Sequence, residues 1–188
     1  MLRVIVIIAA VLLIALALTV ATRPDSFRIQ RSASIKAPAE RIFPLIADFH
    51  AWEGWSPWEK IDPALQRTYS GPASGTGATY EWTGNKNVGK GRMEILDQSP
   101  PFRVVIKLDF LEPFEGHNTA EFTLQPAGEA TNVTWAMYGP NTLVGKVMGS
   151  FFSMDKMIGD QFDKGLSALK AEAEMPTSPF PLHLLPHS

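Results

Sequence analysis

Apolar and polar residues alternate in several short segments through the middle of the chain, and no other pattern limits the fold as much. In 102-FRVVIKLDF-110 every second side chain from Phe102 to Phe110 is apolar, so an extended strand would carry them on one face. Similar segments occur at 27–36, 76–85, 88–96, 120–124 and 133–137. Because short linkers separate these segments, we expect an antiparallel sheet with one buried face and one face in water.

Two other regions have the periodicity of helices. The first, at 37–49, begins with Pro38 and Glu40, which suit the start of a helix, and contains Pro44, which should kink or shorten it. In the second, at about 143–173, apolar residues recur every three or four positions and form one stripe, which we expect to face the sheet: Leu143, Val147, Phe151, Met154, Ile158, Phe162, Leu166 and Leu169.

Gly159 and Gly165 interrupt the second helical region. Glycine destabilises a helix interior by about 1 kcal/mol relative to alanine, so the two positions need a reason. They indicate either a cavity beside the helix or close packing against a bulky strand residue. The order of strand, helix, several strands and helix predicts an α+β domain.

The N-terminal segment is almost entirely apolar. Between Val4 and Ala21 only Thr19 is polar, and at about 1.5 Å per residue a helix of this length spans a hydrocarbon core of roughly 30 Å. Since the run is longer than the apolar core of a secretory signal, we expect an uncleaved anchor. Arg3 and the arginines at 23–31 give opposing signals, and we expect a single-pass protein with its domain outside the cytoplasm. If the segment is cleaved, the domain is secreted.

These features divide the chain into four parts. Residues 1–22 form the transmembrane anchor or signal peptide, 23–26 a linker, and 27–174 the folded domain. Residues 175–188 contain four prolines, and we expect a disordered tail there because proline continues neither a helix nor a central strand.

Composition excludes several classes of function. The formal net charge is −2 and there is no basic stripe, which argues against nucleic acid as a partner. Cysteine is absent, so disulfides and thiolate chemistry are excluded, and the four histidines show no metal-ligand spacing. The acids of the strand segments fall on the wet face by alternation. We therefore predict no catalytic residue, no metal and no cofactor.

Four segments resemble the START-like superfamily, often labelled SRPBCC or polyketide cyclase/dehydrase. They are 31-RSASIKAPAERIFPLIADFHAWEGWSPWEKIDP-63, 75-GTGATYEWTGNKNVGKGRMEI-95, 130-ATNVTWAMYG-139 and 159-GDQFDKGLSALKAEAE-174. The resemblance implies a helix-grip fold, in which a curved seven-stranded antiparallel sheet wraps around a long C-terminal helix, with two short helices after the first strand. In this chain we expect an N-terminal membrane helix before the helix-grip domain. The resemblance also implies an apolar cavity between sheet and helix, which in such domains binds lipids or other hydrophobic molecules.

We therefore expect a membrane-tethered module that binds a hydrophobic or amphipathic, lipid-like molecule without chemistry. The candidate cavity residues point inward from strands, lip or final helix: Trp55, Tyr80, Trp82, Met93, Phe110, Phe122, Trp135, Ile158 and Phe162. Arg31, on the apolar face of the first strand, either binds an anionic headgroup or extends to water at the sheet's end. Two alternatives stay open, a cyclase or dehydratase and a protein-interaction module of the chaperone-activator type.

Three of the five tryptophans lie in 51-AWEGWSPW-58. The resemblance places this stretch at the lip of the cavity, between the first helices and the second strand. We expect the indoles to pack the lip against the sheet, with Trp55 best placed to touch a ligand. Contact with a membrane is the alternative, because indoles favour interfaces.

Overall fold

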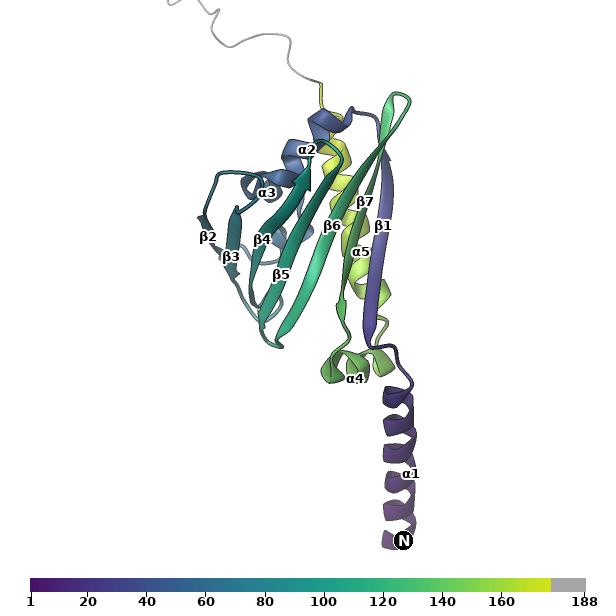
Figure 1. Cartoon of the computed structure of the whole chain (residues 1–188). Coiled ribbons are helices and arrows are strands. Elements are labelled where there is room, and N and C mark those ends of the chain that lie inside the picture. Colours follow the sequence, from purple (N-terminus) through teal and green to yellow (C-terminus); the bar gives the residue numbers. More distant parts are fainter. Residues whose placement is uncertain (177–188) are drawn as a thin grey trace, which may run out of the picture.

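A seven-stranded antiparallel sheet curves around the C-terminal helix (Figure 1). The computed structural model describes residues 1–176, so most of the tail predicted at 175–188 lies outside the described residues. The strands are β1 (Ser26–Ile35), β2 (Gln66–Ser70), β3 (Thr79–Thr83), β4 (Lys90–Ser99), β5 (Arg103–Glu112), β6 (Gly116–Ala127) and β7 (Ala130–Pro140). Their order in the sheet is β1-β7-β6-β5-β4-β3-β2, so the first and last strands are neighbours. The helix-grip fold is confirmed.

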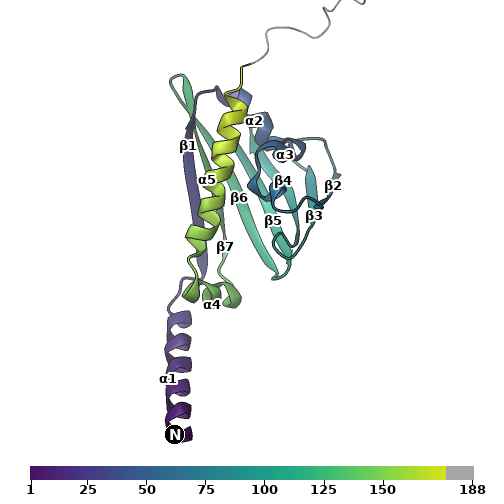
Figure 2. The same ribbon diagram turned by 180° about the vertical axis from the view of Figure 1, so that it is seen from behind.

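The helical elements are α1 (Leu2–Ala21), α2 (Ala39–Ala47), the 3₁₀ turn η1 (Phe49–Ala51), α3 (Trp52–Trp55), the 3₁₀ turn η2 (Pro57–Lys60), α4 (Leu143–Phe151) and α5 (Met154–Ala173). Helices α2, α3 and α5 lie on one face of this sheet, while α4 and α1 lie at one end of the domain (Figure 2). We call the segment from η1 to η2 the lip. Helix α2 continues through Pro44 and stops three residues later, as expected of a helix shortened by proline.

The register of the strands places the inner-face residues in rows. Val104 pairs with Phe122, Phe122 with Trp135, and Trp135 with Arg31, which makes one row across β5, β6, β7 and β1. Strand β2 was not predicted from alternation. It is a five-residue edge strand in which exposed and half-buried positions alternate and no residue is fully buried, so its sequence carries a weak signal.

The prediction of one continuous helix over 143–173 is wrong. Phe152 is extended (φ −131°, ψ 142°), and Ser153 caps a new helix because its hydroxyl accepts a hydrogen bond from the Lys156 amide. As a result Leu143 and Phe151 do not face the sheet and are 70% and 66% exposed. The apolar stripe is buried only within α5.

Close packing explains the two helical glycines. A Cβ atom on Gly165 would lie 2.7 Å from Cζ3 of Trp135 and 3.1 Å from Cδ of Pro57. A Cβ atom on Gly159 would collide with the guanidinium of Arg31. Of the two alternatives left open by the sequence, the structure therefore supports close approach at both positions.

Helix α1 projects away from the domain, beyond α4 (Figure 1). None of its 20 residues is buried against the rest of the protein. Within residues 1–176 it is the one helix that is long and apolar enough to cross a membrane.

Candidate ligand-binding site

Aromatic side chains fill the space between the sheet and α5. Trp135 of β7 lies at the centre, stacked on Phe162 of α5 with ring centroids 4.3 Å apart and on Phe122 of β6 at 4.8 Å. From the lip, Trp55 and Trp58 each approach Trp135 at 5.5 Å in edge-to-face geometry. We call these five residues the Trp135 cluster. It joins sheet, lip and helix in one apolar unit.

The indole nitrogen of Trp135 is buried without a hydrogen-bond partner among the described residues. An unpaired buried donor costs about 1–3 kcal/mol relative to a paired one. An acceptor atom on a bound molecule would satisfy it. The centre of the cluster thus combines closely packed aromatic rings with one unused polar group.

Two other indoles fix the lip to α2. Trp52 Nε1 donates to the Ile46 carbonyl at 3.0 Å, and Trp55 Nε1 donates to the Leu45 carbonyl at 2.8 Å. Both carbonyls belong to the last turn of α2, where no backbone amide of the helix can reach them. Trp52 and Trp55 are only 3% and 1% exposed, so these two indoles pack the lip and do not reach a membrane.

The other predicted cavity residues form a second group beside the first. Tyr80 stacks on Trp82 at 5.9 Å, Trp82 meets Phe110 edge-on at 6.0 Å, and Met93 pairs with Tyr80 across the strands. Phe49 of the lip lies 6.0 Å from Tyr80 and 5.5 Å from Trp52. Trp52 in turn lies 4.7 Å from Trp55, so these two lip residues connect the second group to the Trp135 cluster. Ile158, near the start of α5, is partly buried against the same core.

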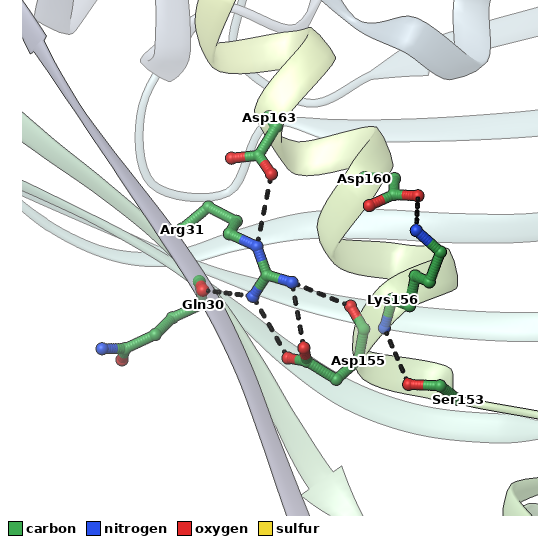
Figure 3. A network of polar contacts seen from close by, with 7 residues as sticks. All are labelled: Gln30, Arg31, Ser153, Asp155, Lys156, Asp160 and Asp163. Carbon is green, nitrogen blue, oxygen red and sulfur yellow. Dashed lines mark hydrogen bonds and ion pairs between the residues drawn. The ribbon is translucent and has the colours of Figure 1, made fainter.

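Arg31 is held apart from the cluster by carboxylates of α5, although its Cα pairs with Trp135 (Figure 3). Its guanidinium donates to both the side chain and the backbone carbonyl of Asp155 at 3.0–3.1 Å, and its Nε lies 3.4 Å from Asp163. The hydrogen bond from Arg31 lowers the pKa of the Asp155 carboxyl. These contacts fasten β1 to α5, and the binding of a headgroup by Arg31 stays a prediction.

A buried acid also borders the second group, and sequence reasoning missed it. Tyr80 Oη donates to Glu59 at 2.5 Å and Arg67 Nε donates to its other oxygen at 2.6 Å. The Glu59 side chain is 5% exposed. Burial, together with the hydrogen bond to Glu59, raises the pKa of Tyr80 well above its usual value, so the phenol stays protonated. Glu59 lies in a 3₁₀ turn, where strand alternation gives no signal.

Two hollows of the described surface lie outside the Trp135 cluster. One, of about 640 Å³, is an apolar groove between the second half of α1 and Asn141, Leu143, Lys146 and Val147. The other, of about 250 Å³, lies beside His50 and Tyr69 at the edge of the sheet. The aromatic side chains of the Trp135 cluster themselves fill the space between the sheet and α5.

Comparison with known proteins identifies one family and several similar structures. Residues 26–174 match the family described as polyketide cyclase / dehydrase and lipid transport. No curated protein matches the chain. Similar solved structures include CV1439 from Chromobacterium violaceum, with 17% identity, 82% of this chain and 100% of that chain covered, and a TM-score of 0.56. Major latex-like protein 151 from Panax ginseng has 13% identity, coverage of 81% and 100%, and a TM-score of 0.58. The Aha1 dimer from Colwellia psychrerythraea has 19% identity, coverage of 79% and 97%, and a TM-score of 0.54. At such identities these likenesses show the fold alone.

Proposed function

The chain belongs to the polyketide cyclase/dehydrase and lipid-transport family, and we propose that it binds a hydrophobic or amphipathic small molecule between the sheet and α5. The observation that carries the proposal is the unpartnered Nε1 of Trp135 inside an aromatic cluster. A ligand with a long apolar part and one hydrogen-bond acceptor matches this surface. We also propose that α1 tethers the domain to a membrane, with the domain outside the cytoplasm.

Binding at this position requires the cluster to open. Of the three lip tryptophans, Trp58 is the one that is only partly buried, and it contacts both Trp135 and Phe162. Its indole can swing outward while Trp52 and Trp55 keep the lip fixed to α2 through their hydrogen bonds. A ligand in the space so formed would place its acceptor next to Trp135 and its apolar part against Phe162.

The test is saturable binding of a fluorescent fatty acid to the full chain in lipid nanodiscs, measured against empty nanodiscs. Trp135→Phe keeps an aromatic ring and removes the donor, and we expect binding to weaken about five- to tenfold, as for the loss of one hydrogen bond. Phe102→Leu, an exposed substitution in the β4–β5 hairpin, is the control and should bind as the unmodified chain does. Fluorescence equal to that of empty nanodiscs would contradict the proposal.

A proton-transfer enzyme is the second candidate, and the buried pair of Tyr80 and Glu59 favours it. Such chemistry needs a carboxylate that is free to accept a proton from a substrate. Here both oxygens of Glu59 already accept hydrogen bonds, one from Tyr80 and one from Arg67. The pair is therefore satisfied as a structural network, and we place binding without chemistry first.

A further inference from the structure

Helix α4 and the start of α5 present apolar side chains to solvent. The residues concerned are between 37% and 70% exposed, and we call them the α4 patch: Leu143, Val144, Met148, Phe151, Phe152, Met154 and Met157. They all lie within one short stretch of chain, residues 143–157. An exposed apolar surface gathered in this way indicates contact with another apolar phase.

The amphipathicity of α4 is the reverse of that expected for a helix packed on its own domain. At 100° per residue, Leu143, Val144, Met148 and Phe151 fall within an arc of about 140°. Lys146 and the small residues of the helix occupy the remaining side. A core-packed helix buries its apolar side, whereas here that side is the exposed one.

Contacts with the linker hold α4 against the end of α1. Arg23 donates to the Gly149 carbonyl at 2.6 Å, Lys146 pairs with Asp25 at 2.6 Å, and Asn141 donates to the Pro24 carbonyl at 3.1 Å. In both views α4 lies across the point where α1 leaves the domain (Figures 1 and 2). The apolar groove between the two helices is lined by Leu143 and Val147 of α4, so part of the apolar side of α4 faces α1.

The sheet adds another apolar group at the same end. Strand β7 ends beside α4, and the antiparallel order brings the β5–β6 hairpin to this end as well. Phe114 in that hairpin is 59% exposed. The end of the domain nearest α1 therefore carries exposed apolar side chains on two separate elements.

We infer that the α4 patch rests in the interfacial layer of the lipid bilayer that α1 crosses. This inference rests on the proposed anchoring by α1. Helix α4 then lies in the plane of the membrane, with Phe151 and Leu143 at the level of the upper acyl chains and Lys146 and Arg23 at the level of the headgroups. A lipid chain fills the groove between α1 and α4. The domain is held at the surface, so an apolar ligand can pass between bilayer and domain without a path through water.

The absence of cysteine makes the depth of single side chains measurable. We would introduce Phe151→Cys, Phe152→Cys, Leu13→Cys and Phe102→Cys one at a time and attach a nitroxide label. The full chain would be reconstituted in vesicles of phosphatidylcholine and phosphatidylglycerol. Collision rates of the label with oxygen, which concentrates in lipid, and with a water-soluble nickel chelate report its surroundings. Near-ultraviolet circular dichroism confirms that each variant folds.

We expect labels at 151 and 152 to resemble the label at 13 within α1, with oxygen collisions favoured several-fold over the chelate. The label at 102, at the opposite end of the domain, should favour the chelate. If position 13 is in lipid while 151 and 152 behave like 102, the inference on α4 is overturned and the anchor stands. If position 13 is in water, the anchor fails and the inference with it. Labels at 151 and 152 shielded from both reagents would show that protein, a second copy or a partner, covers the patch, which also overturns the inference.

Discussion

Trp55 and Trp135 belong to one cluster but differ in one hydrogen bond, and this difference can be measured. Trp55→Phe leaves the Leu45 carbonyl at the end of α2 without its donor, whereas Trp135→Phe removes a donor that has no partner. We expect Trp55→Phe to lower the free energy of unfolding by about 1–3 kcal/mol more than Trp135→Phe. Urea unfolding of the full chain in one detergent gives both values. A loss as large for Trp135→Phe would contradict the assignment.

Glu59 accepts hydrogen bonds from Tyr80 and Arg67 in a nearly closed environment. Glu59→Gln removes the charge that compensates Arg67, and a broken buried pair costs roughly 3–5 kcal/mol. Because Arg67 is partly exposed, we expect the lower end of this range. Glu53→Gln, an exposed partner 3.8 Å from Arg67, is the control and should cost less than about 1 kcal/mol. A fully stable Glu59→Gln protein would instead make Glu59 a stronger candidate for proton transfer.

His117 lies on the outer face of the sheet with Nδ1 2.8 Å from Asp109 and Nε2 3.3 Å from Glu115. The hydrogen bond with Asp109 raises the pKa of His117 above 6.5. Since the folded pKa exceeds the unfolded one, the stabilisation is present in full below the unfolded pKa and is lost as the pH rises through the folded pKa. An NMR titration should give a midpoint above 6.5 that falls in Asp109→Asn. An unchanged midpoint in the variant would exclude this cause.

At the scale of elements, α5 packs closely on the sheet and the lip because Gly165 has no side chain. Gly165→Ala would place a methyl group against Trp135 and Pro57. Overpacking costs typically 1–3 kcal/mol, while alanine favours a helix by about 1 kcal/mol, so we expect a net loss of stability of about 1 kcal/mol. Gly116→Ala, whose new methyl would meet no heavy atom nearer than 3.7 Å, is the matched control. Equal stability of both variants in urea unfolding would refute the close contact.

The break between α4 and α5 divides one amphipathic pattern into an exposed apolar part and a part that packs on the sheet. The apolar stripe passes from Phe151 to Met154 in helical phase, so periodicity alone gives no sign of an interruption. Ser153 followed by Asp155 is an N-cap signature that marks the new start. After the break, Phe162 and Leu166 pack on the sheet, while before it the same type of residue remains exposed.

At the scale of the whole molecule, α1 decides whether the protein stays at a membrane. If α1 is an anchor, the intact mass of the mature protein includes the N-terminal segment, and the protein remains in membranes after extraction with sodium carbonate. Cleavage near Ala21 would give a mass lower by that segment and a soluble product. Intact-mass spectrometry of protein from its membrane fraction distinguishes the two. The second result would contradict both the anchor and the lipid contact of α4.

The sequence by itself determined the features that depend on local periodicity. Alternation predicted six strands and their buried faces, including those of Phe122 and Trp135, because a strand repeats every two residues whatever surrounds it. The uninterrupted apolar run at the N-terminus predicted α1, because its length matches that of a membrane-spanning helix. The family resemblance added the seventh strand and the helix-grip arrangement.

Only the tertiary structure determined which polar groups have hydrogen-bond partners and which apolar side chains are buried. Arg31 lies on the inner face as its position predicts, yet its guanidinium pairs with carboxylates of α5, among them Asp155, which is 124 residues away along the chain. The burial of Glu59, the unpartnered nitrogen of Trp135 and the exposure of Phe151 are likewise set by elements distant in sequence. A residue's own neighbours in the chain fix its direction, but the partner that it meets there is supplied by the fold.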